Sequence, residues 1–91
     1  MSNYYDALPL DAAEQIEQLS RLAYELREDR RRLLAGHGTD SEEALLERIR
    51  QGDVPEHPAY EHYLGASSLA ATRAAVRSQL QGVLHELGGG S

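Results

Sequence analysis

The sequence contains no cysteine, phenylalanine or tryptophan, and each absence excludes a class of structure. Without cysteine the chain forms no disulfide and offers no thiolate for zinc binding or nucleophilic catalysis. Without phenylalanine and tryptophan, its core must be built from aliphatic side chains. A chain of 91 residues buries only about 60–65% of the surface that it exposes when unfolded. Such a small core needs further support, which oligomerisation commonly supplies.

Lysine is also absent, so all nine basic side chains are arginines, and the formal net charge is −6. The negative charge repels nucleic-acid phosphates and anionic lipid heads, so we expect no nucleic-acid or membrane partner. Two explanations of the arginine preference stay open: GC-rich codon usage, or the bidentate pairing with carboxylates that lysine makes poorly. Without a signal-peptide pattern or a run of about 18 apolar residues, we expect a cytoplasmic protein.

The strongest structural signal is a long helix over residues 11–35. Asp11 and Glu14 have the spacing of a capping box, and Gly36 is a natural stop. The helix would be about 37 Å long, more than the width of a small domain, so it needs a partner along its length. Its apolar residues recur at alternating steps of four and three, which places them on one face. They are Ala12, Ile16, Leu19, Ala23, Leu26 and Leu33, widened by Leu22 and Leu34.

We predict one helical domain over residues 11–87. The two ends of the chain are predicted to lie outside it. Residues 1–10 form an apolar lead-in that we expect to be extended before Pro9. This arm either covers the end of its own domain or is exchanged with a second subunit. Residues 88–91, three glycines and a serine, are predicted to be a flexible tail.

Two short helices are predicted between the long ones. Capping-box spacings at Thr39 and Glu42, and at Asp40 and Glu43, start the first, which Gly52 ends. The second runs over residues 58–64.

That second short helix begins with Pro58, which suits a first helical position, and stops at Gly65. A last long helix then begins at Ser67 or Ser68 and continues to about residue 87. Its apolar stripe is formed by Leu69, Val76, Leu80, Val83 and Leu87, with Arg73 at one position of the seam.

The stretch 56–63 is the most unusual in the chain. Tyrosines often seat a small element on a helical core, and histidines with carboxylates can bind a ligand or metal. His57 and Glu61 are four residues apart and share a helix face, so a symmetric dimer would double them to four ligands. However, no Glu-x-x-His or His-Glu-x-x-His pattern occurs, so we expect no catalytic residue, metal or cofactor. The candidate binding residues here are Glu56, His57, Tyr60, Glu61, His62 and Tyr63.

Two arginines complete the set of candidate residues. Arg30 and Arg73 occupy seam positions, and antiparallel packing of the long helices would place them at about the same height. We expect the acidic middle segment to neutralise them, through Asp53, Glu56 or Glu61. Alternatively, both side chains extend to water along their apolar stems, or together bind an anion or a partner's carboxylate.

Together these signals predict an all-α protein: an antiparallel hairpin of two long helices with two short helices between them, completed as a four-helix core in a homodimer. We expect a non-catalytic protein that acts through protein–protein interaction, as an accessory, adaptor or regulatory subunit. Two alternatives stay open. One is an acidic inhibitor of the antitoxin or immunity type that covers a basic partner, and the other is a small-ligand or metal-binding protein that uses the 56–63 segment.

Overall fold

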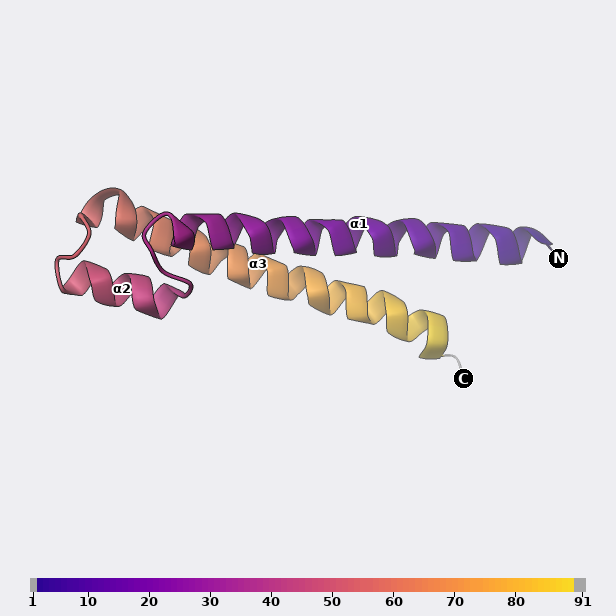
Figure 1. Cartoon of the computed structure of the whole chain (residues 1–91). Coiled ribbons are helices and arrows are strands. Elements are labelled where there is room, and N and C mark those ends of the chain that lie inside the picture. Colours follow the sequence, from indigo (N-terminus) through magenta and orange to yellow (C-terminus); the bar gives the residue numbers. More distant parts are fainter. Residues whose placement is uncertain (1, 90–91) are drawn as a thin grey trace.

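The computed structural model describes the backbone of residues 2–89 and the side chains of residues 11–88. It contains the helices α1 (Ser2–Ala35), α2 (Glu42–Arg50) and α3 (Glu56–Gly89), and the described residues form no strand. Helices α1 and α3 run antiparallel and pack together, while α2 packs against α3 near the turn between them (Figure 1). The predicted all-α helical hairpin is therefore confirmed.

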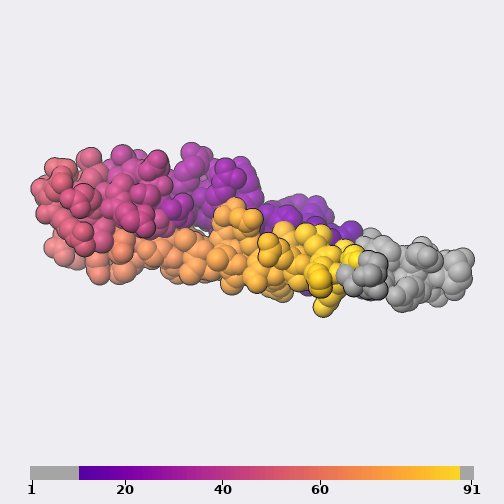
Figure 2. All heavy atoms as spheres, turned by 90° about the horizontal axis from the view of Figure 1, so that it is seen from below, coloured from indigo at the N-terminus to yellow at the C-terminus, as the bar shows by residue number. Residues whose placement is uncertain are grey.

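The molecule is long and thin, with extents of 65 × 20 × 15 Å and a radius of gyration of 18.6 Å. A compact domain of this length would have a radius of gyration of about 12 Å. Helix α2 thickens only one end, which we call the closed end, and the ribbons of α1 and α3 diverge away from it (Figure 1). In the space-filling view of Figure 2, α2 is likewise gathered at this end.

The buried core lies at the closed end, where all three helices meet. Leu34 from α1 and Leu45 from α2 are fully buried, together with Ala59 and Ala66 of α3. Ile49, Val54 and Tyr63 pack around them. Along the rest of the hairpin, the buried hydrophobic side chains described are Ala12, Ala23 and Val76. Most leucines of the long helices therefore have one neighbouring helix and remain partly exposed.

Helix α1 begins much earlier than its sequence pattern predicts. Residues 2–10, which we expected to be extended, are helical, and Asp11 is therefore not a helix cap. A continuing helix gives the amides of residues 11–14 carbonyl partners in the preceding turn, which removes the need for a capping side chain. We also expected this arm to cover its own domain or to be exchanged with a second subunit. The side chains of residues 1–10 lie outside the described residues.

The closed end contains one separate short helix, so the prediction of two was wrong. The expected helix of residues 58–64 is the beginning of α3, which has a non-helical His57 and a cis bond before Pro58. Gly65 does not end this helix. It lies within α3, at a point where α3 packs against α1. A Cβ atom at Gly65 would stand 3.3 Å from Cδ1 of Leu33, tighter than an ordinary contact. The glycine thus allows close approach of the two long helices.

The start of α2 also differs from the predicted capping boxes. The cap is Ser41, whose hydroxyl accepts a 3.1 Å hydrogen bond from the amide of Ala44. Thr39 instead closes the end of α1, because its hydroxyl donates to the carbonyl of Leu34 at 2.8 Å. Gly52 follows α2 with a φ of +75°, a conformation that glycine adopts readily, as expected for the predicted end.

Candidate functional site

The seam arginine of α1 joins α1 to α2. Arg30 donates two 2.6 Å hydrogen bonds to the carboxylate of Glu42, one from Nε and one from an Nη atom. Both side chains are largely covered, with 30% and 15% exposed. The hydrogen bonds hold the pKa of Glu42 below its ordinary value and raise the pKa of Arg30. The expected partners of Arg30 were Asp53, Glu56 or Glu61, but α2 brings Glu42 to this position instead.

Arg73 on α3 does not lie at the height of Arg30. Its Nε donates a 3.2 Å hydrogen bond to the backbone carbonyl of Ala23. Ala23 precedes Arg30 by seven residues, or about 10 Å along α1. The two arginines therefore do not form one anion site, and Arg73 instead fixes the register between α1 and α3.

The residues of the 56–63 stretch point in different directions. His57 Nδ1 donates to Glu61 across the predicted four-residue spacing, at 2.8 Å, on an exposed surface. This bond raises the pKa of His57 and lowers that of Glu61. The negative charge of the exposed Glu56 also raises the pKa of His57, to a smaller extent. Tyr60 and Tyr63 stack with ring centroids 5.9 Å apart, and Tyr63 packs against the core.

His62 belongs to a separate cluster with a residue that sequence reasoning missed. His37 Nε2 lies 2.8 Å from His62 Nδ1, and both rings are partly buried. The pair borders an open groove of about 480 Å³, which we call the histidine groove. Its other lining residues are Asp29, Arg32, Leu33, Gly36 and Leu69. The only sequence signal was a histidine placed between two glycines directly after a long helix.

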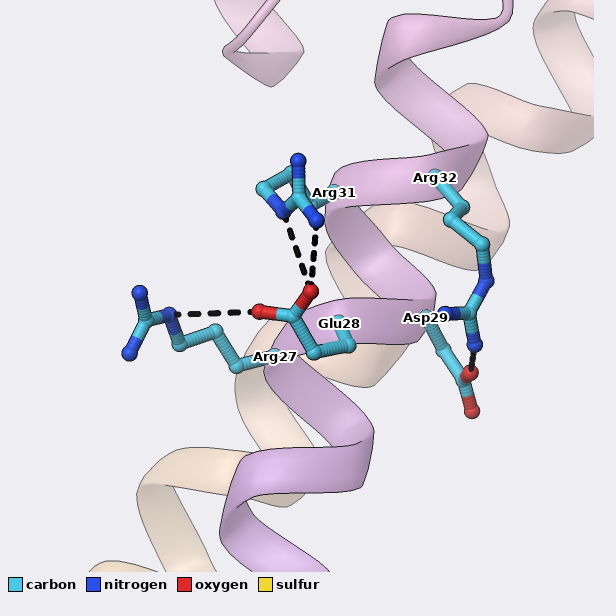
Figure 3. Close-up of polar contacts among 5 residues, drawn as sticks. All are labelled: Arg27, Glu28, Asp29, Arg31 and Arg32. Atoms are coloured by element: carbon cyan, nitrogen blue, oxygen red, sulfur yellow. Dashed lines mark hydrogen bonds and ion pairs between the residues drawn. The ribbon is translucent and has the colours of Figure 1, made fainter.

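The arginine-rich end of α1 is neutralised by its own neighbours. Figure 3 shows Arg27 and Arg31 converging on the carboxylate of Glu28, at 3.8 and 2.6 Å, while Arg32 turns toward Asp29. The bond from Arg31 lowers the pKa of Glu28. These arginines therefore do not present an unpaired basic surface of the kind that binds phosphate backbones.

The acidic middle segment is also partly neutralised within the chain. Glu42 pairs with Arg30, Glu61 with His57, and Glu47 with Arg50 and Gln51. Several of the carboxylates that an acidic inhibitor would present to a basic partner are therefore already engaged.

A further candidate surface is apolar and follows both long helices, turned away from the core beneath α2. Leu34 points into the core beneath α2, whereas its neighbour Leu33 turns about 100° away and lines the histidine groove with Leu69. Residues 7 and 11 positions from Leu33, or 7, 11, 14 and 18 positions from Leu69, share this side of their helices. We call the resulting surface the leucine face: Leu22, Leu26 and Leu33 of α1 with Leu69, Leu80, Val83 and Leu87 of α3, while Val76 of the same stripe is buried.

Neither a membrane span nor a metal cluster is found in the described part of the chain. None of its helices has a stretch with the length and hydrophobicity of a membrane span. Among residues 11–88, no three His, Asp or Glu side chains gather in a way that would hold a metal ion.

Comparison with known proteins gives one match, which covers most of the chain. Searches among curated proteins and solved structures return no similar protein. One protein family matches over residues 12–87, which include the partly and fully buried positions of both long helices, the whole of α2 and the histidine groove. The chain therefore belongs to the Uncharacterized protein MJ0235 family.

Proposed function

We propose that this chain is a non-catalytic helical interaction protein whose working form is a homodimer. In this dimer the leucine faces of two hairpins pack together and complete a four-helix core. The leucine face supports the proposal because it follows both long helices on the side that α2 does not cover. Leu22 and Leu87 on this face remain 41% and 49% exposed.

The chain exposes more surface than a compact protein of its size, and the excess is large enough for a dimer interface. A compact protein of 10.1 kDa exposes about 5,300 Å², whereas this chain exposes 6427 Å². The excess of about 1,100 Å² exceeds the roughly 800 Å² that each partner buries in a standard protein interface. A second copy on the leucine face would bring the exposed area per chain close to that of a compact protein.

A second copy also fits the chemistry of the leucine face. The face itself is aliphatic, and two charged side chains that line the groove beside it, Asp29 and Arg32, are paired with each other. An aliphatic surface of this kind suits a second copy of itself better than a strongly charged partner. In the dimer, α2 and the exposed Tyr60 would stay at the surface, where a further protein partner can bind.

Two leucines of equal exposure provide a matched test. Leu87 and Leu64 are both 49% exposed on α3, but Leu64 lies about 140° around the helix from the leucine face. We expect Leu87→Gln to weaken dimerisation by about tenfold, because it leaves a polar amide in an apolar interface. Leu64→Gln should leave it within about twofold of the native chain.

The readout is light scattering coupled to size-exclusion chromatography over a concentration series. Equal effects of the two substitutions would contradict the assignment of the interface to the leucine face. Circular dichroism of each variant shows whether the hairpin itself is retained.

A further inference from the structure

The two histidines of the groove bring nitrogen atoms from different parts of the chain to one point. His37 belongs to the turn after α1, between Gly36 and Gly38, and Gly38 has the positive φ of +72° that this turn uses. His62 belongs to α3. Their rings are tilted by 53° with centroids 5.1 Å apart, and His37 Nε2 lies 2.8 Å from His62 Nδ1.

The two nitrogen atoms face each other as two ligands of one metal ion do, with a proton between them in place of the metal. A neutral imidazole has one N–H donor and one lone pair, so one ring donates here and the other accepts. If the donating ring carries its proton on the other ring nitrogen instead, both rings stay neutral and both lone pairs face the gap, where a metal ion can bind them. Two zinc–nitrogen bonds of about 2.05 Å at a tetrahedral angle place the nitrogens about 3.3 Å apart. The rings need to separate by only about 0.5 Å, which small side-chain rotations can provide.

The surroundings leave room for the remaining ligands. The groove beside the pair has a volume of about 480 Å³ and is lined on its apolar side by Leu33 and Leu69. The charged groups nearby are Asp29 and Arg32, which pair with each other, and Glu61, which accepts from His57. The cation that lines the groove, Arg32, is thus balanced by Asp29, and the face of the two imidazoles toward the groove can hold water or a small anion.

We infer that His37 and His62 form a two-imidazole site for a divalent transition metal ion, open toward the histidine groove. Imidazole ligands favour Zn²⁺, Ni²⁺ and Cu²⁺ over Mg²⁺ and Ca²⁺, and Cu²⁺ binds most tightly in this series. The site goes beyond the proposed interaction function and does not require the dimer. It is a different site from the predicted His57 and Glu61 pair, which also forms but lies on the exposed surface.

A bound ion would tie the end of α1 to α3 at the place where Gly65 meets Leu33. Because the two ligands come together only in the folded chain, binding would stabilise the closed end of the hairpin by mass action.

Calorimetric titration of the metal-free native chain with ZnCl₂, NiCl₂ and CuCl₂ tests the site. We expect one ion per chain, with His37→Gln and His62→Gln each lowering the affinity by at least about tenfold. His57→Gln is the matched control, because His57 is an exposed histidine of the same helix bonded to Glu61, and its affinity should stay within about twofold. MgCl₂ should give no heat of binding.

A nitrogen-15 spectrum of the histidine rings of the native chain provides a test that needs no variant to fold. Added Zn²⁺ should shift Nε2 of His37 and Nδ1 of His62 and leave the rings of His57 and His85 in place. Absence of binding at millimolar ion would overturn the site. So would an equal loss of affinity in His57→Gln, or zinc shifts confined to His57 and His85.

Discussion

The guanidinium of Arg30 and the carboxylate of Glu42 form a two-pronged contact, with both N···O distances at 2.6 Å. The contact joins the last turns of α1 to the first turn of α2, where a carboxylate also interacts favourably with the helix dipole. It uses the feature of arginine that lysine lacks, the planar fork of N–H donors. Arg30 thus holds α2 in place at the closed end.

Breaking this contact from one side should destabilise the hairpin. Arg30→Leu leaves Glu42 partly covered and without its partner, so we expect the free energy of unfolding to fall by about 1–2 kcal/mol. If Arg30 merely extended to water from the seam, the same change would raise stability. The double variant Arg30→Leu with Glu42→Leu should recover about 1 kcal/mol relative to the sum of the single changes. Urea unfolding at one fixed protein concentration measures all four species.

The Arg30 contact also predicts a dependence on acid. The pKa of Glu42 is lowered in the folded chain, chiefly by its hydrogen bond from Arg30. A lowered folded pKa means that this stabilisation is fully present above the ordinary value of 4.5 and is lost as the pH falls through the folded pKa. The native chain should therefore lose stability more steeply below about pH 4.5 than Arg30→Leu does. Parallel slopes in urea titrations of the two proteins would contradict this coupling.

His57 should act in the opposite direction on pH. Its pKa is raised by the bond to Glu61, so its stabilisation is present below the ordinary value of 6.5 and disappears as the pH rises through the folded pKa. The pair is exposed, so the effect on stability should be small. An NMR titration of His57 is the direct measurement, and Glu61→Gln should return its midpoint toward the ordinary value.

Two helical glycines of α3 should respond differently to alanine. A Cβ at Gly82 meets nothing within 4 Å, so Gly82→Ala should stabilise the chain by about 0.5–1 kcal/mol through helix propensity. At Gly65 the new Cβ would press on Leu33 at 3.3 Å, which should offset most of that gain. Gly65→Leu should separate α1 from α3 and cost about 1–3 kcal/mol. Thermal unfolding would contradict this packing if Gly65→Leu were as stable as the native chain.

The start of α2 offers a direct test of its cap. Ser41→Ala removes the acceptor for the Ala44 amide and should cost about 1 kcal/mol. Asp40→Ala, one residue earlier and exposed, should change stability by less than about 0.5 kcal/mol. If Asp40→Ala were the more damaging change in chemical denaturation, the predicted capping box at Asp40 and Glu43 would be favoured over Ser41.

Helical periodicity was sufficient to predict the two long helices, because each keeps apolar residues on one face over many turns. Their ends were less predictable. Pro9 and Asp11 look locally like a helix start, yet α1 runs through both, and Gly65 looks like a helix stop, yet it is a contact point with Leu33. A glycine's role depends on what lies beside it in space, which spacing along the chain does not encode.

Among the candidate residues, contacts within one helix could be predicted from the sequence, whereas contacts between elements could not. The spacing of His57 and Glu61 was enough to predict their contact, because both lie on one helix. The Arg30 contact with Glu42 and the His37 contact with His62 join residues 12 and 25 positions apart. These contacts depend on how α2 and the turn after α1 fold back, which no local pattern determines.

Self-association of the native chain is the most direct test of the proposed function. Sedimentation equilibrium at micromolar concentration should give a mass of about 20 kDa, twice the 10.1 kDa of one chain. The dimer should dissociate on dilution, and the helical circular dichroism per residue should fall much less than the fraction of dimer. A well-folded species of 10.1 kDa at every concentration, up to the highest that stays in solution, would contradict the homodimer.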